Sequence, residues 1–294
     1  MGRLLERIDK RLLPEVVDRR VSTDGARKYL LRLHDGSLVE TVGIPHGDAD
    51  VPRRLTVCYS TQVGCAMGCA FCSTGRQGLT RNLAADEILW QLVLVERDFG
   101  CPVASAIAMG QGEPLANYAA LTEAIGVIAH AEGLGLPAKD IAVSTCGLTE
   151  GIRALAADGV PTTLAVSLHA ATQDLRDTLM PGARNHPLGR LHEALAAYSQ
   201  STGRHVVIQS LMLDGVNDAD TDLDALAAFC EGLDARVSLL RFNCVEGIPF
   251  APSAYGKAML WSLELTKRGI DASINVPRGA DVDAACGQLA NRHS

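Results

Sequence analysis

No stretch of this 294-residue sequence approaches the roughly 18 consecutive apolar residues that a membrane-spanning helix needs. The opening Met1-Gly2-Arg3-Leu4 is not followed by the apolar region of a secretion signal. The nine cysteines are an odd number, so they cannot all pair in a disulfide framework. These absences argue against a membrane or secreted protein and predict a soluble chain in the reducing cytoplasm.

A strong excess of basic charge is missing as well. The formal net charge is −7, which argues against wholesale electrostatic capture of nucleic acid. The charge is uneven, however, because residues 1–34 carry nine Lys and Arg against five Asp and Glu, a local excess of +4. Such a basic arm suits contact with RNA phosphates, and it would suit a solvated helix face equally well.

Three cysteines lie on one short segment. Cys65, Cys69 and Cys72 form a C-x3-C-x2-C pattern, and no fourth cysteine completes the set nearby. Thiolates are the usual ligands of iron–sulfur clusters, so three of them on a four-iron cluster leave one iron open. This spacing is that of the radical S-adenosylmethionine (SAM) enzymes, in which SAM binds the open iron. The pattern also leaves zinc and redox or inert thiols as alternatives, although the second C-x2-C unit typical of zinc sites is missing.

Short apolar runs alternate with helical patterns along the chain. Strands that alternate with helices favour a parallel sheet covered by helices, so the sequence predicts an α/β fold. Six such units favour a partial (β/α)6 TIM-like barrel of the radical SAM type, after a short N-terminal β-hairpin over 28–33 and 38–44. The strands are expected at 55–60, 104–109, 141–144, 163–168, 206–213 and 237–242, and the helices near 84–99, 117–132, 149–158, 187–201, 221–232 and 254–268.

The sequence contains no low-complexity linker or internal repeat that would divide it. We therefore expect one barrel domain over 51–280, preceded by a small extension over 1–50 and followed by a C-terminal segment over 281–294.

Polar and glycine-rich motifs follow the predicted strands. Active sites of barrels lie at the C-terminal ends of the strands, so these motifs are expected to meet at one rim. Gly110 and Gly112 would let the backbone approach a ligand closely. Glu113 could accept a hydrogen bond from an ammonium group, and an ordinary Glu-Pro turn is the alternative for an isolated motif. The motifs after successive strands are 65–72, 109–114, 144–147, 167–170 and, after the sixth strand, Asn243-Cys244.

Further motifs complete a recognisable set: Glu40-Thr41-Val42-Gly43-Ile44-Pro45, Cys58, Cys72-Ser73-Thr74-Gly75, Gly112-Glu113-Pro114, Val143-Ser144-Thr145, Ser167-Leu168-His169-Ala170, 213–218, Arg278-Gly279 and 281–289. Over essentially all of 40–289, the chain resembles the RlmN/Cfr family of radical SAM RNA methyltransferases. The resemblance implies methylation of carbon 2 of an adenosine, rather than carbon 8, in rRNA or tRNA.

The resemblance also implies a mechanism with two cysteines and two SAM molecules, because neither adenine carbon is a nucleophile. Cys286 would take a methyl group from SAM, and a 5′-deoxyadenosyl radical would then activate that methyl group for addition to the base. Glu40 would accept the proton of the ring carbon, and Cys58 would release the product by forming a disulfide. Cys65, Cys69 and Cys72 would hold the [4Fe-4S] cluster. The implied SAM contacts are Gly112, Glu113, Ser144, Ser167, Leu168, His169 and Asn243.

The resemblance implies two partners: an RNA substrate, either rRNA or tRNA, and an electron donor such as flavodoxin. We expect the protein to be a monomer. The chain departs from typical RlmN members because only about 50 residues precede the barrel, where those carry an N-terminal accessory domain. It also has Arg241-Phe242-Asn243-Cys244 where the family usually has an aromatic residue and Asn-Pro. Two alternatives remain: a radical SAM enzyme acting on a substrate other than RNA, and a non-catalytic iron–sulfur RNA-binding protein.

Overall fold

The computed structural model describes residues 8–47 and 52–289. Within these residues the centre is a ten-stranded sheet in the order β1-β2-β3-β4-β7-β8-β9-β10-β11-β12, and β5 and β6 form a separate ribbon. The strands are β1 (Glu15–Val21), β2 (Arg27–Arg32), β3 (Leu38–Gly47), β4 (Pro52–Cys58), β5 (Gln62–Gly64), β6 (Leu79–Asn82), β7 (Val103–Ala108), β8 (Ile141–Thr145), β9 (Thr163–Ser167), β10 (Val206–Met212), β11 (Ala235–Arg241) and β12 (Asp271–Asn275).

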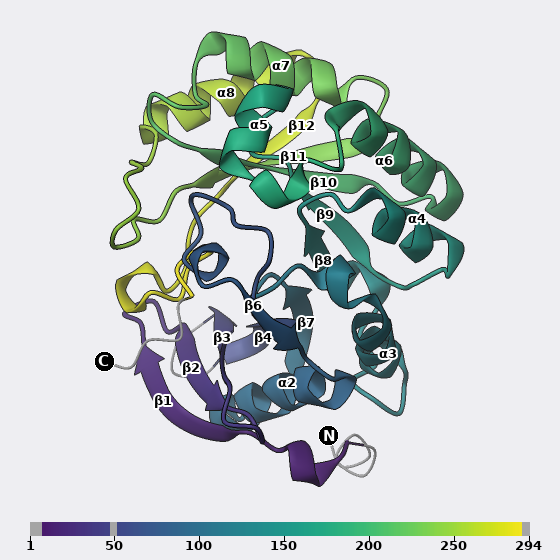
Figure 1. Cartoon of the computed structure of the whole chain (residues 1–294), viewed down its shortest axis with the longest axis vertical. Coiled ribbons are helices and arrows are strands. Elements are labelled where there is room, and N and C mark those ends of the chain that lie inside the picture. Colours follow the sequence, from purple (N-terminus) through teal and green to yellow (C-terminus); the bar gives the residue numbers. More distant parts are fainter. Residues whose placement is uncertain (1–7, 48–51, 290–294) are drawn as a thin grey trace.

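From β4 to β12 all neighbouring strands of this sheet are parallel. Figure 1 shows the sheet curving around a central space, with the connecting helices on its outer side. The helices are α2 (Ala85–Phe99), α3 (Tyr118–Ala129), α4 (Thr149–Ala157), α5 (Gln173–Leu179), α6 (Leu188–Thr202), α7 (Asp220–Cys230) and α8 (Tyr255–Lys267). Short 3-10 turns are η1 (Lys10–Leu12), η2 (Thr74–Arg76), η3 (Pro114–Asn117), η4 (Ala138–Asp140), η5 (Pro181–Ala183) and η6 (Ala280–Val282).

The predicted α/β partial barrel and its N-terminal hairpin are confirmed. The structure adds β12, which pairs with β11 after α8, and the short helix α5. The sequence analysis missed β12 because its residues, 271–275, are exposed or half-buried and contain no apolar run. Among the described residues no helix is both long enough and apolar enough to cross a membrane.

Helix α2 shows why these segments become helices. The Glu87 carboxylate accepts the backbone N–H of Ala84 (2.9 Å), which caps the first turn, and Gly100 ends the helix in the left-handed conformation (φ 62°). Its apolar residues, among them Ile88 and Leu92, are fully buried against the sheet. At about 25 cal/mol per Å² of apolar area, such burial is the main stabilising contribution to the barrel wall.

The N-terminal extension continues the barrel sheet through antiparallel pairs. Strand β1 pairs with β2, β2 with β3, and β3 with β4, so that Val42 stands opposite Cys58. Much of its basic charge is paired: Arg19 and Arg27 bind Asp98, and Arg32 binds Glu15. Arg3 and Arg7 lie outside the described residues.

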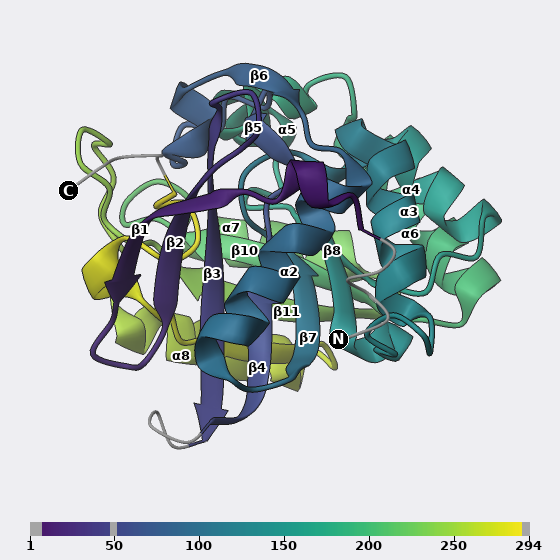
Figure 2. The same cartoon turned by 90° about the horizontal axis from the view of Figure 1, so that it is seen from below.

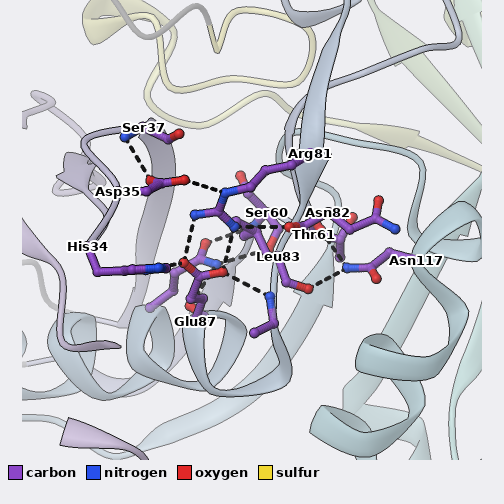
Figure 3. Close-up of polar contacts among 12 residues, drawn as sticks. His34, Asp35, Ser37, Ser60, Thr61, Arg81, Asn82, Leu83, Glu87 and Asn117 are labelled. Atoms are coloured by element: carbon purple, nitrogen blue, oxygen red, sulfur yellow. Dashed lines mark hydrogen bonds and ion pairs between the residues drawn. The ribbon is translucent and has the colours of Figure 1, made fainter. Parts of the chain in front are cut away.

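Arg81 ties the hairpin tip to the barrel, as Figure 3 shows. Its guanidinium donates to both carboxylate oxygens of Glu87 on α2 (2.8 and 2.9 Å) and to Asp35 in the β2–β3 turn (2.6 Å). The Arg81 guanidinium holds the pKa of Asp35 well below its usual range. Burial works to raise the pKa of Glu87, but the hydrogen bonds from Arg81 and Ala84 lower it below the usual value. The turn, β6 and α2 are therefore fixed together beside the loop that carries the three cysteines, as seen from below in Figure 2.

Candidate active site

A cavity of about 150 Å³ opens at the C-terminal ends of the parallel strands. Its wall combines motifs from the loops after successive strands, as the sequence analysis expected from barrel geometry. The polar and sulfur-bearing residues that line it include Cys65, Cys69, Cys72, Gly110, Gly112, Glu113, Ser144, Thr145, Cys146, Ser167, His169, Gln209 and Cys286. We call it the first cavity.

The loop 65–72, here called the cluster loop, is held by backbone contacts at both ends. The N–H of Cys65 donates to the Gly78 carbonyl (2.9 Å), and the N–H of Ala70 donates to the carbonyl of Leu179, the last residue of α5 (2.9 Å). Gly182 lies so close that a Cβ there would stand 2.6 Å from the Met67 Cα atom. The unpredicted α5 thus has a role, because it presses the cluster loop into the barrel mouth.

The thiols of the cluster loop are buried close to one another. Burial, together with the neighbouring Cys69 and Cys72 thiols, raises the pKa of Cys65 to about 12. Burial and the Cys69 thiol likewise raise the pKa of Cys72. Cys146 lies beside them with its sulfur 4.0 Å from the Cys69 sulfur, and that contact and burial raise its pKa. Thiolates gathered here would repel each other unless a cation or cluster binds them.

Within residues 8–47 and 52–289, no three His, Cys, Asp or Glu side chains gather closely enough to hold a single metal ion. A four-iron cluster does not require such a group, because each of its thiolate ligands binds a different iron. A soft, all-sulfur donor set on one buried loop fits an iron–sulfur cluster better than a single hard cation. The residues present therefore fit a [4Fe-4S] cluster.

A buried polar network holds the glycine-rich loop that follows β7 against the residues just before the cluster loop. The Gln111 N–H donates to Ser60 Oγ (2.8 Å), and the Glu113 N–H donates to Gln62 Oε1 (2.8 Å). Gly112 has φ 104°, and a Cβ there would stand 2.6 Å from the Gln62 Cβ, so only glycine fits without displacement. This close packing brings the backbone of Gly110 and Gly112 to the cavity wall.

The Glu113 carboxylate is 2% exposed and joins two loops. Its oxygens accept the N–H groups of Leu115 (3.0 Å) and Cys146 (2.7 Å). Burial raises the pKa of Glu113, and these backbone hydrogen bonds oppose the rise. Each carboxylate oxygen has two lone pairs, so Glu113 can still accept a hydrogen bond from a ligand in the cavity.

The next strands supply hydroxyl, amide and imidazole groups. Ser144 Oγ donates to Gln209 Oε1 (2.9 Å), and Ser167 Oγ lies 3.4 Å from the same amide oxygen. His169 has a φ of 57°, packs edge-on against Phe71 and accepts the Leu211 N–H at Nδ1 (3.2 Å). Burial lowers the pKa of His169 to about 3, so the ring is neutral near pH 7. Cys146 lies in the predicted motif 144–147 but had no predicted role, and Gln209 was not predicted because it lies inside a strand and belongs to no motif.

The C-terminal segment closes over this cavity. Its Gly287 carbonyl accepts the Ser73 N–H (2.8 Å), and its Leu289 carbonyl accepts the Thr74 hydroxyl (2.8 Å), so it is bonded directly after Cys72. Cys286 is exposed as a residue and lines the first cavity, whereas burial of its sulfur atom raises the pKa of the thiol.

Cys286 also lines a second, adjoining cavity, together with Cys58, Ile107, Asn243 and Arg241. Burial and the neighbouring Cys286 thiol raise the pKa of Cys58, so the two thiols lie within electrostatic reach of each other. One cysteine therefore faces both the cavity with the cluster loop and the cavity with the second cysteine.

Two of the expected SAM contacts, Leu168 and Asn243, do not line the first cavity, and neither does the expected proton acceptor Glu40. Leu168 is fully buried, and its N–H donates to the Gln209 carbonyl (3.0 Å). Asn243 lines only the second cavity and donates to the Cys286 carbonyl (3.3 Å). Glu40 is fully buried on β3 with Lys28 Nζ 3.2 Å from Oε1, and it lines neither cavity.

A family model described as the Radical SAM superfamily matches residues 59–227, more than half of the chain. The chain belongs to the radical SAM superfamily. Members use a [4Fe-4S] cluster and SAM, which accords with the thiol loop and the cavity beside it.

Relatives of known name assign the chain to one family within this superfamily. The probable dual-specificity RNA methyltransferase RlmN of Thermosynechococcus vestitus is 42% identical over 280 residues, which cover 94% of this chain and 80% of the relative. The protein of the same name from Picosynechococcus sp. is 40% identical over 275 residues, covering 94% and 78%. The crystal structure of a radical SAM methyltransferase from Sphaerobacter thermophilus has a TM-score of 0.90 and 39% identity, covering 96% of this chain and 82% of that one. The chain is therefore a member of the RlmN family of radical SAM proteins.

Proposed function

We propose that this radical SAM protein methylates carbon 2 of an adenosine in rRNA or tRNA, through an S-methyl intermediate on Cys286. The names of its relatives, dual-specificity RNA methyltransferases, support the RNA substrate. The observation that carries the proposal is the position of Cys286 in the wall between the two cavities. A thiol that must collect a methyl group on one side and deliver it on the other needs this position.

The first cavity would hold the cluster and SAM. When bound, they supply radical chemistry that removes a hydrogen atom from a methyl group. Cys65, Cys69 and Cys72 would bind the cluster through three thiolates. Gly112, Ser144, Ser167 and His169 would contact SAM from the cavity wall, and Glu113 would accept a hydrogen bond from its ammonium group. Leu168 and Asn243 would act from behind this wall, through the backbone of the β9–α5 loop and through the carbonyl of Cys286.

The second cavity would hold the adenine. Both thiols rest protonated near neutral pH, since burial raises the pKa of Cys58 and of Cys286. Cys286 must lose its proton to accept a methyl group, because the thiolate is the nucleophile. After the methylene carbon has bonded to the base, the Cys58 thiolate would attack the Cys286 sulfur. A sulfur–sulfur bond then forms as the sulfur–carbon bond breaks, and the released carbon takes up a proton to become the methyl group. The radical adduct also has to lose one electron, for which the bound iron–sulfur centre would be the acceptor, before the methylated base leaves.

Glu40 is proposed as the acceptor of the ring-carbon proton. Side chains alternate along a strand, so Glu40, Val42 and Ile44 share one face of β3. Val42 packs against Cys58, and Ile44 lines the second cavity. The carboxylate thus lies on the face of the sheet that bears Cys58, with Lys28 at 3.2 Å to balance its charge.

The test compares two cysteine variants of anaerobically reconstituted protein on unmodified rRNA and tRNA transcripts. Cys286→Ala has no sulfur to methylate, so it should give neither methylated RNA nor covalent RNA. Cys58→Ala can still add to the base but cannot release it, so an RNA–protein crosslink should accumulate. Mass spectrometry of the nucleosides would distinguish 2-methyladenosine from 8-methyladenosine in the wild-type product.

Two results would contradict the proposal. Cleavage of SAM without methylation of any RNA would point to another substrate. RNA binding without SAM cleavage would point to a non-catalytic protein. We further propose that the enzyme works as a monomer with a flavodoxin-type electron donor, which can be checked by size-exclusion chromatography and by replacing the chemical reductant with reduced flavodoxin.

A further inference from the structure

Two arginines line the second cavity, and only one of them is used by the fold. Arg278 donates to the Asp24 carboxylate (2.9 Å) and to the Asp24 carbonyl (2.7 Å), which ties the C-terminal segment to the β1–β2 turn. In the described part of the chain, no ion pair or hydrogen bond involves the Arg241 guanidinium, and its Nε is buried without an acceptor. The ring of Tyr255 lies 6.0 Å from its Cζ atom, too far for a strong cation–π contact.

A buried guanidinium N–H without an acceptor is costly, so native proteins rarely keep one without a purpose. Arg241 ends β11, and the rim formed by strand ends is where barrels bind substrate. It also shares the second cavity with Cys58 and Cys286. The two terminal nitrogens of the Arg241 guanidinium, unlike Nε, are not buried, so they can donate to an acceptor on a ligand in this cavity.

The cavity wall indicates which kind of acceptor fits. Most of the other lining side chains are apolar, among them Ile44, Ile107, Met109 and Leu240. Flat, neutral nucleobases suit such walls, whereas a phosphate would lose its hydration there with only one unpaired cation to compensate. Adenine offers acceptors at N1 and N3, the two ring nitrogens that flank carbon 2. A donor to either nitrogen fixes the direction in which carbon 2 points.

We propose that Arg241 donates a hydrogen bond to N1 or N3 of the target adenine and so orients carbon 2 toward Cys286. This inference rests on the proposed function, because it places the methylated base in the second cavity. Arg241 is then a substrate-binding residue that selects both the base and the carbon that reacts.

The experiment combines a protein change with an atomic change in the RNA. Equilibrium binding and methylation are measured for wild type, Arg241→Met and Arg241→Lys, on RNA that carries adenosine, 1-deazaadenosine or 3-deazaadenosine at the target position. The RNA is a transcript that the wild-type enzyme methylates. Arg236→Met is the matched control, since Arg236 lies on the same strand but pairs with exposed Asp271 away from the cavity.

We expect Arg241→Met to bind the adenosine RNA about tenfold or more weakly, the size of a lost hydrogen bond from a charged donor. Wild type should lose a similar factor on one of the two deaza RNAs, and Arg241→Met should lose nothing further on that RNA. Arg241→Lys should recover part of the affinity, and Arg236→Met should match wild type. Among the described residues no hydrogen bond is lost with Arg241, and Arg241→Met removes a buried N–H without an acceptor, so this variant should unfold at the same urea concentration as wild type or a higher one.

Failure of this inference can be separated from failure of the proposed function. If wild type methylates no RNA, the proposed function fails. If wild type methylates RNA while Arg241→Met binds and methylates it equally well, only the role of Arg241 is overturned. If Arg241→Met binds all three RNAs more weakly than wild type by the same factor, Arg241 contacts a phosphate instead, and the proposed contact with the base is overturned. The wild-type response to the deaza RNAs is informative even if a variant fails to fold.

Discussion

Glu113 offers the sharpest test of the SAM site, because its carboxylate serves the fold and the ligand at once. It is buried, and it accepts one N–H from Leu115 and one from Cys146. Glu113→Gln keeps the shape and one oxygen, but its amide NH2 must face one of these two N–H donors. Glu113→Ala leaves both donors without an acceptor.

The two roles predict two different magnitudes. A charge-assisted hydrogen bond to the SAM ammonium group contributes roughly 1.5–3 kcal/mol, so its loss should weaken SAM binding about ten- to hundredfold in both variants. Each buried N–H left unpaired costs about 1–3 kcal/mol, so Glu113→Ala should also lower the free energy of unfolding by about 2–6 kcal/mol. The glutamine variant should lose less stability but a similar factor in SAM affinity.

Calorimetric SAM binding to anaerobically reconstituted protein measures the first effect, and urea denaturation measures the second. Iron content must stay unchanged for the comparison to hold. Glu96→Gln is the control, because Glu96 also accepts a backbone N–H, from Val103 (2.9 Å), at the opposite end of β7. It should lose some stability and bind SAM normally. Unchanged SAM affinity in a folded, cluster-loaded Glu113→Gln protein would remove Glu113 from the site.

Three further predictions concern the cluster loop and the hairpin. Replacing Cys65, Cys69 or Cys72 of the cluster loop with alanine should abolish both iron binding and SAM cleavage. Zinc as the only stoichiometric metal in anaerobically purified wild-type protein would refute the iron–sulfur cluster. Gly182→Ala, whose Cβ would clash with the cluster loop, should lower iron occupancy, whereas Gly189→Ala has open space and should keep it; equal occupancies would contradict the packing argument. Arg81→Met should cost about 3 kcal/mol of unfolding free energy because it leaves a buried carboxylate unpaired, against less than about 1 for exposed Arg190→Met. The two carboxylate partners of Arg81 have lowered pKa values, so the loss of unfolding free energy in Arg81→Met should be largest above about pH 5 and should shrink as the pH falls toward about 3. A loss that stays constant over this pH range in urea denaturation would argue against the ion pairs.

The barrel could be predicted because its information is local. Most of the parallel strands contain a short apolar run, such as Val206–Met212, which is buried along nearly its whole length. Most of the helices are long enough to show an apolar face of their own. Parallel strands share one C-terminal edge, so the motifs after them had to meet. The structure accordingly brings Cys65, Glu113 and Ser144 into one cavity, although they come from different loops.

The sequence did not predict what depends on long-range packing or on polar edges. Strand β12 has no apolar run, and α5 is too short for a periodic pattern. The second cavity was not predicted, because its wall combines residues from segments far apart in the sequence, namely β3, β4, β11 and the C-terminal segment. In the sequence Arg241 looks like an ordinary strand residue, but within the described residues Arg278 has a carboxylate partner and Arg241 has no such partner.

The position of Cys286 shows how such long-range contacts determine chemistry. Its segment is bonded to Ser73 and Thr74, the two residues directly after the cluster-loop cysteine Cys72. The chain just before this segment is tied to the β1–β2 turn through Arg278 and Asp24. Ordering of the cluster loop and placement of the Cys286 thiol are therefore one structural event. An unfolded cluster loop would release the thiol from the wall between the cavities, and the methyl acceptor would be in place only when the loop is ready to bind its cluster.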